Sequence, residues 1–367
     1  MKRIRPISLT AGLALAMSPA LVGGMSAPAS ADVSLKGKTI TIIINSKPGG
    51  GTDGNARLVG SNMANHLPGK PRVIFKNLPG GGGIKANNYF YQKVKPDGMT
   101  LLVGSRTQIS PTKLRHKAAK YNPAEYRFVG GTIRLGTLVL VRKEQLPRLT
   151  DPKAKPLAFG GIDGERSGTA MAAWAKEFLG WNIKFVLGYP GATDMIMSAR
   201  RGESDIIANQ NVYNVEPLIK EGMIALVQFG QRDDNGKMIP RTSFPKVPVF
   251  DNLIRPKLKG AALKAYQTWM DDQLVDKWMA LPPKTPDAYV ETYRKAYAAV
   301  MKDRKFMDIA KREFGEDFEA YPGKTMDKIA QDLAATPNED LAYFLDLRKK
   351  LGLPSGKKKK KKKKSRK

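Results

Sequence analysis

The chain of 367 residues contains no cysteine and only two histidines. The absence of cysteine excludes disulfide scaffolds, thiolate zinc sites, iron–sulfur clusters and cysteine nucleophiles. The histidines, His66 and His116, stand in unrelated sequence contexts (NHLPG and LRHKA), which argues against a histidine-rich metal site. We therefore expect the protein to hold no metal ion and no cofactor.

Long apolar runs are scarce as well. Residues 7–17 are apolar but form too short a stretch to span a bilayer. Three basic residues precede this stretch, and Ala29-Ser30-Ala31 follows it with the small-x-small pattern that a signal peptidase accepts. We interpret residues 1–31 as a signal peptide and expect the mature protein in the periplasm.

Acidic residues are few, with 33 Asp and Glu against 63 Lys and Arg, so the formal net charge is +30. The signal peptide and the terminal segment Lys357–Lys367 together carry 13 of these charges, and the body between them keeps +17. A basic protein often binds nucleic acid, but no recognition motif is present and an exported protein rarely meets nucleic acid. We expect no nucleic-acid partner, which leaves anionic membrane surfaces and small anionic ligands.

The body alternates between strand and helix patterns, which predicts doubly wound parallel sheets of the α/β class. A body of this length favours two domains over one core. Predicted strands lie at 39–44, 72–75, 100–103, 137–141, 157–159, 184–187, 205–208 and 224–229. Predicted helices start near residue 53 and span about 169–179, 193–201 and 213–221, with helical periodicity again over 285–314, 325–335 and 338–351.

Two glycine-rich loops follow the first two predicted strands. Residues 46–54 read SKPGGGTDG, and residues 77–83 read NLPGGGG. Glycine allows a ligand to approach backbone N–H groups, and the start of a helix favours an anion. Tight turns that need positive φ angles are the alternative explanation for each loop, but two loops after consecutive strands favour a binding site.

A dinucleotide-binding enzyme is an alternative interpretation of the first loop, because Gly49, Gly51 and Gly54 match G-x-G-x-x-G. Such a site requires an acidic residue at the end of the second strand to hold the ribose. Lys76 and Asn77 stand there instead, so the motif lacks its expected partner.

Three blocks of the sequence resemble one protein family. These blocks are KTITIIINSKPGGGTDGNAR, VIFKNLPGGGGIKAN and KPDGMTLLVGS. Together they are similar to the N-terminal signature of the Bug family, the periplasmic solute receptors of tripartite tricarboxylate transporters. Weaker similarity continues through YPGA (189–192), RGESD (201–205) and WMALP (278–282).

The resemblance implies a two-lobed periplasmic-binding-protein (flytrap) fold, with two doubly wound sheets joined by crossover strands. Lobe one would comprise 32–131 and 274–353, lobe two 132–273, and residues 354–367 a disordered Lys-rich tail. It implies that a small organic carboxylate, a di- or tricarboxylate or an aromatic acid, binds between the glycine loops. The partners would be integral membrane transporter subunits, and we expect a monomer.

The candidate ligand-binding residues follow from the loops and from this resemblance. Asp53 matches the family aspartate and is interpreted as a helix N-cap that holds the loop in shape. Lys47 and Arg106 depart from the family pattern, and either could pair with a distal carboxylate of the ligand. For the candidates in lobe two, an ordinary cap or turn is an equal alternative. The full set is Ser46, Lys47, Gly50, Gly51, Thr52, Asp53, Gly81, Gly82, Gly83, Ser105, Arg106, Ser167, Thr169, Thr193, Asp194 and Asn209.

An enzyme is not expected, since neither histidine lies in a motif with a nucleophile. Asp271 and Asp272 are adjacent acids, which a helix directs to different faces, so we interpret them as surface charges. The segment 251–275 is longer than the usual family connection, and its role stays open. A further alternative is an exported basic protein that associates with anionic membrane or polymer through its Lys-rich tail.

Overall fold

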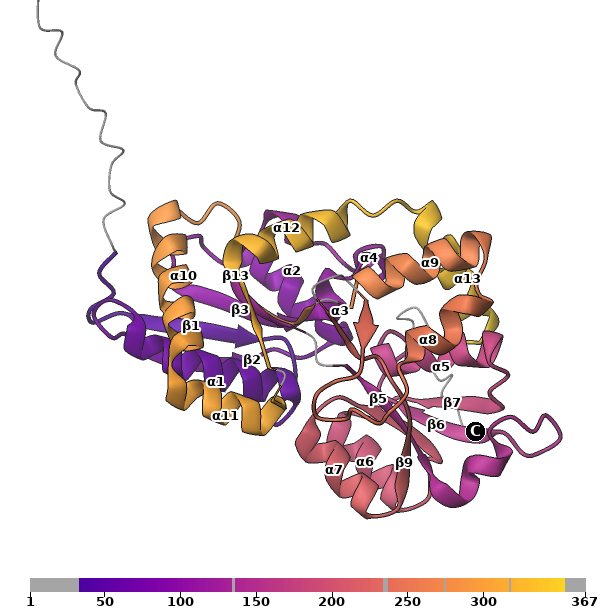
Figure 1. The fold of residues 1–367 in the computed structure, drawn as a ribbon. Coiled ribbons are helices and arrows are strands. Elements are labelled where there is room, and N and C mark those ends of the chain that lie inside the picture. The colour runs from indigo at the N-terminus through magenta and orange to yellow at the C-terminus, as the bar shows by residue number, and fades with distance from the viewer. Residues whose placement is uncertain (1–32, 134–135, 234–236, 274, 317, 354–367) are drawn as a thin grey trace, which may run out of the picture. The chain divides into compact units, whose positions relative to one another are not determined.

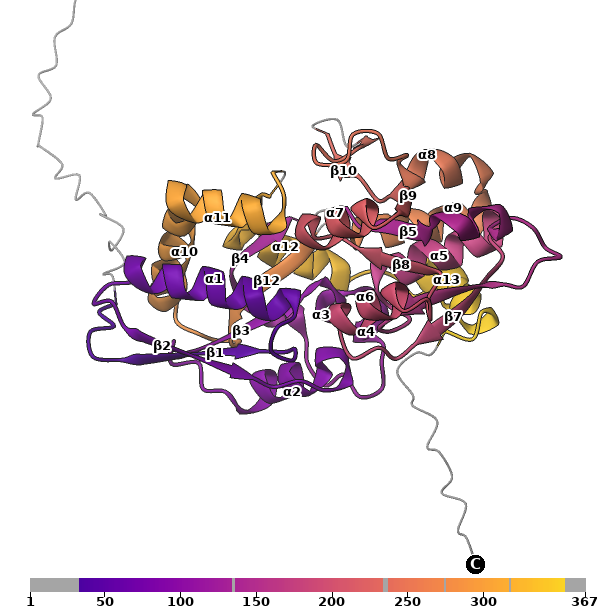
Figure 2. The same ribbon diagram turned by 90° about the horizontal axis from the view of Figure 1, so that it is seen from below.

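Two β-sheets organise the protein in the computed structural model, which describes residues 33–133, 136–233, 237–273, 275–316 and 318–353 (Figures 1 and 2). The expected signal peptide and Lys-rich tail lie outside these residues. Both sheets belong to one compact unit that starts at Asp32.

The first sheet has the strand order β13-β4-β12-β3-β1-β2. Its strands are β1 (Thr39–Ile44), β2 (Arg72–Asn77), β3 (Thr100–Ser105), β4 (Arg127–Ile133), β12 (Val275–Leu281) and β13 (Ala320–Pro322). Its helices are α1 (Gly51–His66), α2 (Ile84–Lys93), α3 (Arg106–Ile109), α4 (Pro111–Leu114), α10 (Asp287–Lys302), α11 (Arg304–Phe314) and α12 (Gly323–Ala334), with short 3-10 turns at Gly81–Gly83 and Pro123–Glu125.

Helices cover both faces of the first sheet. In strand β1, Ile42 and Ile44 pack with α1 and α10 on one face, whereas Ile43 packs with α2 and α12 on the other. Successive strand side chains point to opposite faces, so a strand buried on both faces needs an uninterrupted apolar run. This explains the TITIII sequence of β1.

The second sheet has the order β7-β6-β8-β5-β9. Its strands are β5 (Leu138–Arg142), β6 (Leu157–Gly161), β7 (Ile183–Leu187), β8 (Ile206–Asn209) and β9 (Met223–Gln228), and a small ribbon pairs β10 (Gln231–Arg232) with β11 (Met238–Ile239). The helices are α5 (Ser167–Phe178), α6 (Ala192–Arg200), α7 (Val212–Lys220), α8 (Phe250–Ile254), α9 (Gly260–Asp271) and α13 (Glu339–Lys350), with 3-10 turns at Lys143–Arg148 and Arg255–Lys257.

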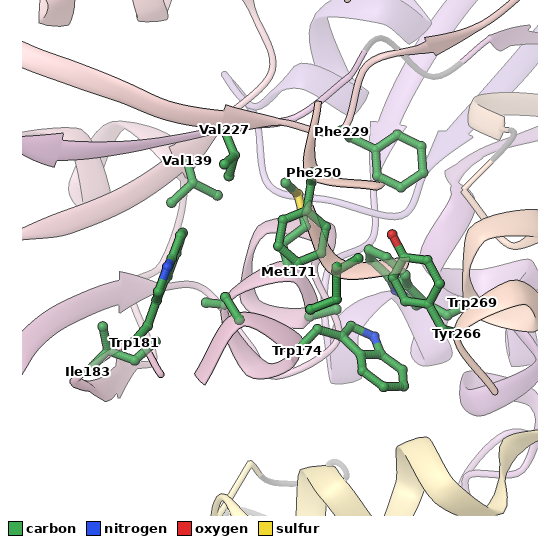
Figure 3. Close-up of a cluster of buried hydrophobic side chains, with 14 of the residues drawn as sticks. Val139, Met171, Trp174, Trp181, Ile183, Val227, Phe229, Phe250, Tyr266 and Trp269 are labelled. Carbon is green, nitrogen blue, oxygen red and sulfur yellow. The ribbon is translucent and has the colours of Figure 1, made fainter. Parts of the chain in front are cut away.

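The long connection 251–275 forms part of the second core. Helix α8, which begins one residue before this segment, and helix α9 within it bring Phe250, Tyr266 and Trp269 into one buried cluster with Trp174 of α5 (Figure 3). The rings of Trp174 and Tyr266 meet edge to face at 5.4 Å. Phe344 of α13 stacks on the same indole at 5.4 Å, so α13 packs on the second core, although the expected division assigned it to lobe one.

The sheets are mixed, not wholly parallel as the alternation of elements predicted. The trios β2-β1-β3 and β7-β6-β8 are parallel, and each of these strands is followed by a helix or a helical turn. Strands β4, β5, β12 and β13 pair antiparallel. Between β4 and β5 the chain passes from the first sheet to the second, and β12 returns it, which places these strands outside the βαβ pattern.

Candidate ligand-binding site

A cavity of about 720 Å³ lies at the carboxyl ends of parallel strands from both sheets. Loops that follow β1, β3, β6, β7 and β8 form its wall. The predicted residues that line it are Ser46, Lys47, Gly50, Gly51, Thr52, Ser105, Arg106, Ser167, Thr169, Thr193, Asp194 and Asn209. The structure does not bring Asp53, Gly81, Gly82 or Gly83 into this wall.

The first glycine loop leads into α1 without a side-chain cap. The N–H groups of Gly50, Gly51 and Thr52 have no acceptor among the described residues, although Gly50 supplies its carbonyl to Gly54. Gly50 has an ordinary φ of −89°, and a Cβ added at Gly51 would meet only Asn211 Nδ2, at 3.8 Å. Neither backbone conformation nor close packing demands glycine at these positions. The lack of side chains instead leaves the backbone N–H groups accessible from the cavity.

Asp53 is the third residue of α1 and not its N-cap, which is Gly50. Its carboxylate accepts bonds from Gly49 N (2.9 Å), Asn77 Nδ2 (2.8 Å) and Arg57 Nε (3.1 Å). Burial raises the pKa of this carboxyl, but the bonds from Arg57, Asn77 and Gly49 outweigh burial and hold the pKa below its ordinary value. The ionised carboxylate therefore braces the loop from behind the cavity wall.

The second glycine loop turns through positive φ angles of 59°, 63° and 92° at Gly81, Gly82 and Gly83. Such angles are costly for any residue with a side chain. Gln108 Nε2 donates to Gly82 O at 2.8 Å, and an added Cβ at Gly82 would lie 3.1 Å from Lys113 Nζ. Glycine is needed here by the turn, and α3 and α4 occupy the approach to it.

Polar side chains on both walls present unused hydrogen-bonding groups to the cavity. Thr52 and Thr107 come from the first-sheet side and Asn209 from the second, and they are 8%, 5% and 7% exposed. Within the described part of the chain, no protein group pairs with either threonine hydroxyl or with Asn209 Nδ2, although Asn209 Oδ1 accepts from Asn211 N at 3.0 Å. These three groups line the cavity, so they are available to hydrogen-bond a polar ligand there.

Arg106 is committed to the protein itself. It is 3% exposed, forms an ion pair with Asp272, and donates from Nη2 to Glu165 O at 3.0 Å. Ser110 Oγ donates to the same Asp272 carboxylate at 2.9 Å. The interpretation of Asp272 as a surface charge is therefore wrong, because the carboxylate is the buried counter-charge of Arg106.

Two candidates from the second sheet also have internal partners. Ser167 Oγ donates to Gln273 Oε1, and Thr169 Oγ1 donates to Asp163 O at 2.9 Å. Thr193 and Asp194 lie in the first turn of α6 and are exposed. The two α5 residues thus fulfil ordinary structural roles at the wall, whereas the α6 residues are exposed at the cavity.

Sequence reasoning missed Thr107, Tyr213, Asp276, Lys277 and Phe314, all of which line the cavity. Thr107 lies two residues beyond the end of β3, a position that could have identified it. Asp276 and Lys277 lie inside β12, and Phe314 ends α11. No local pattern marks these three, since only the packing of distant segments brings them to the cavity.

Neither a family model nor a curated protein matches the chain. Solved structures do match the chain. The periplasmic binding protein BugD is 18% identical over 86% of this chain and 98% of its own, with a TM-score of 0.63. R. palustris Rpa4515 with adipate is 19% identical over 86% of this chain and 97% of its own, with a TM-score of 0.63. MatC from Rhodopseudomonas palustris with bound malate is 19% identical over 84% of this chain and 98% of its own, with a TM-score of 0.59. The chain has the fold of these periplasmic binding proteins. The expected two-lobed flytrap fold is confirmed, and we call the first sheet with its helices the first lobe and the second sheet with its helices the second lobe.

Two kinds of feature are absent from the described residues. No helix there is both long enough and apolar enough to cross a bilayer. No group of three or more histidine, cysteine, aspartate or glutamate side chains is arranged there to hold a metal ion.

Proposed function

We propose that this protein is a periplasmic receptor that captures a small organic carboxylate in the cavity and delivers it to integral membrane transporter subunits. The uncapped first turn of α1 carries this proposal, because its N–H groups face the cavity without an acceptor in the described chain. A carboxylate supplies the missing acceptors, and the positive end of the helix dipole favours its charge.

Two observations support the choice of a carboxylate. The solved structures of similar fold include one protein with bound malate and one with adipate. The opposite wall adds the amide of Asn209, and Thr52 adds a hydroxyl beside the loop. Backbone amides, hydroxyls and amide side chains are suitable donors for carboxylate oxygens.

Capture would work by a shift of population between open and closed forms. A ligand that touches both lobes only in the closed form stabilises that form by the difference in contact. Gly51 of the first lobe and Asn211 of the second approach each other beside the cavity, and α11 packs against α7 across the two lobes. The closed form would then be recognised by the membrane partner.

The proposed role is that of a receptor and not of an enzyme. Neither His66 nor His116 lines the cavity. The adjacent acids Asp271 and Asp272 are paired with Arg232 and Arg106, which leaves them poorly suited to move protons to and from a substrate.

A ligand screen tests the proposal. Thermal-shift measurements followed by calorimetry on aliphatic and aromatic mono-, di- and tricarboxylates should identify acids that raise the melting temperature and bind at one site. Sugars and nucleotides serve as negative controls. A silent acid panel, or binding of a sugar or nucleotide alone, would overturn the proposal.

A further inference from the structure

The charged side chains of the cavity are unevenly balanced. Among the described residues, four basic side chains line it (Lys47, Arg106, Arg166 and Lys277) and two acidic ones (Asp194 and Asp276). An excess of positive charge in a partly enclosed space attracts anions. A cation that already pairs with a carboxylate of the protein attracts a ligand less strongly, so the pairing of each cation matters.

Three of the four cations have carboxylate partners within the protein. Arg106 pairs with the buried Asp272. Lys277 pairs with Asp276 at 2.5 Å. Arg166, at the start of α5, lies 3.5 Å from Asp163.

Lys47 differs from these three. It is exposed, it lines the cavity within the first glycine loop, and its ammonium has neither an ion pair nor a hydrogen bond within the described chain. The sequence left Lys47 and Arg106 as equal candidates for a distal carboxylate. The structure separates them, because Arg106 already has its counter-charge.

The acidic side chain of Asp194 restricts where a second anionic group of the ligand can lie. Asp194 is exposed in the first turn of α6, on the second-lobe wall. Its carboxylate repels another carboxylate from that helix start, so the first-lobe wall around Lys47 and the amides of Gly50 and Gly51 is favoured.

We infer that Lys47 makes the cavity prefer diacids to monoacids of equal length: its ammonium pairs with the second carboxylate, while the open amides of the α1 loop hold the first. This inference rests on the proposed function, since it concerns the same cavity. A single Lys ammonium at an open cavity wall provides a charge-assisted contact that a monoacid of equal length cannot make.

Calorimetry with matched acid pairs tests the inference: succinate and butyrate, glutarate and pentanoate, adipate and hexanoate. The wild-type protein should bind at least one diacid more tightly than its monoacid. Lys47→Gln should lower the affinity for that diacid by about tenfold and leave affinity for the monoacid within about twofold. Lys47→Arg should retain most of the preference, and raising the salt concentration should reduce it.

Lys38→Gln is the matched control, because Lys38 is exposed just before β1 and does not line the cavity. It should leave every affinity unchanged. Equal losses for both members of a pair in Lys47→Gln, or a wild-type preference for the monoacid, would overturn the inference alone. If no carboxylate of the wider screen binds the wild-type protein, the proposed function fails and the inference with it.

Discussion

Asp53 connects the first glycine loop to two other elements through one carboxylate. It accepts bonds from the loop amide of Gly49, from Asn77 at the end of β2, and from Arg57 one turn along α1. Bonds to a charged group contribute more to stability than bonds between neutral groups. The loop that presents open donors to the cavity therefore depends on this acid being ionised.

Asp53→Asn should destabilise the protein by about 1–3 kcal/mol at pH 7 and weaken carboxylate binding. The pKa of Asp53 is lowered in the folded state, so its contribution is complete above the unfolded value of about 4 and is lost as pH falls through the folded value. Urea unfolding of both proteins at pH 7 and pH 3 should show the difference shrinking in acid.

Asp308→Asn is the control for this measurement, because Asp308 is exposed on α11 and its carboxylate has no ion pair or hydrogen bond within the described residues. It should change the free energy of unfolding by less than about 0.5 kcal/mol. A pH-independent difference between wild type and Asp53→Asn would contradict the role of the ionised carboxylate.

At the scale of elements, the two glycine loops have different physical requirements despite their similar sequences. Gly51 is the first residue of α1 and is free of close contacts. Gly82 has a φ of 63° and lies against Lys113. One loop uses glycine to remain open to the cavity, and the other uses it to turn.

Gly51→Val should therefore abolish carboxylate binding while the fold is retained, because the new side chain projects toward Asn211 across the wall. Gly82→Val should instead lower the free energy of unfolding by about 1–3 kcal/mol, with ligand affinity of the folded protein nearly unchanged. Calorimetry and urea unfolding on both variants measure the two effects. Equal loss of binding in both, without destabilisation of Gly82→Val, would place the second loop in the site.

Strand β4 shows how packing between elements overrides a local pattern. Its sequence RFVGGTI contains two adjacent glycines, which weaken a strand prediction. An added Cβ at Gly130 would lie 2.2 Å from the ring of Tyr297, and one at Gly131 would lie 2.4 Å from Met326 Sδ. The glycines make room for α10 and α12, and no signal within β4 itself reveals this.

At the scale of the whole molecule, a buried group of charges connects the lobes. Glu165, in the loop before α5, forms an ion pair with Lys113 of α4 and lies 3.7 Å from Arg348 of α13. All three side chains are 7% exposed or less. Removing one member of such a group weakens the compensation of the charges that stay buried.

Glu165→Gln should lower the free energy of unfolding by about 3–5 kcal/mol, because the buried Lys113 ammonium then loses its ion-pair partner. Asp332→Asn breaks the exposed pair with Lys328 and should cost less than about 1 kcal/mol. Urea unfolding of both variants measures the contrast. Similar small effects would mean that the buried group contributes little to joining the lobes.

The sequence by itself determined the features that depend on neighbouring residues. The apolar run of β1, the glycine loop and the start of α1 are all encoded within residues 39–54, and their periodicity and turn chemistry are local. The partition of the net charge among signal, body and tail also needed only the order of residues. The family resemblance rested on short local blocks of the same kind, and the fold that it implied is confirmed.

Only the tertiary structure decided which residues reach the cavity and which of its charges remain unpaired. Arg106 and Asp272 are 166 positions apart, and Lys113 covers the second glycine loop from another helix. Ion pairing and access depend on distances in space, which a spacing along the chain does not specify. For this reason the sequence alone left Lys47 and Arg106 equivalent, and the folded chain distinguished them.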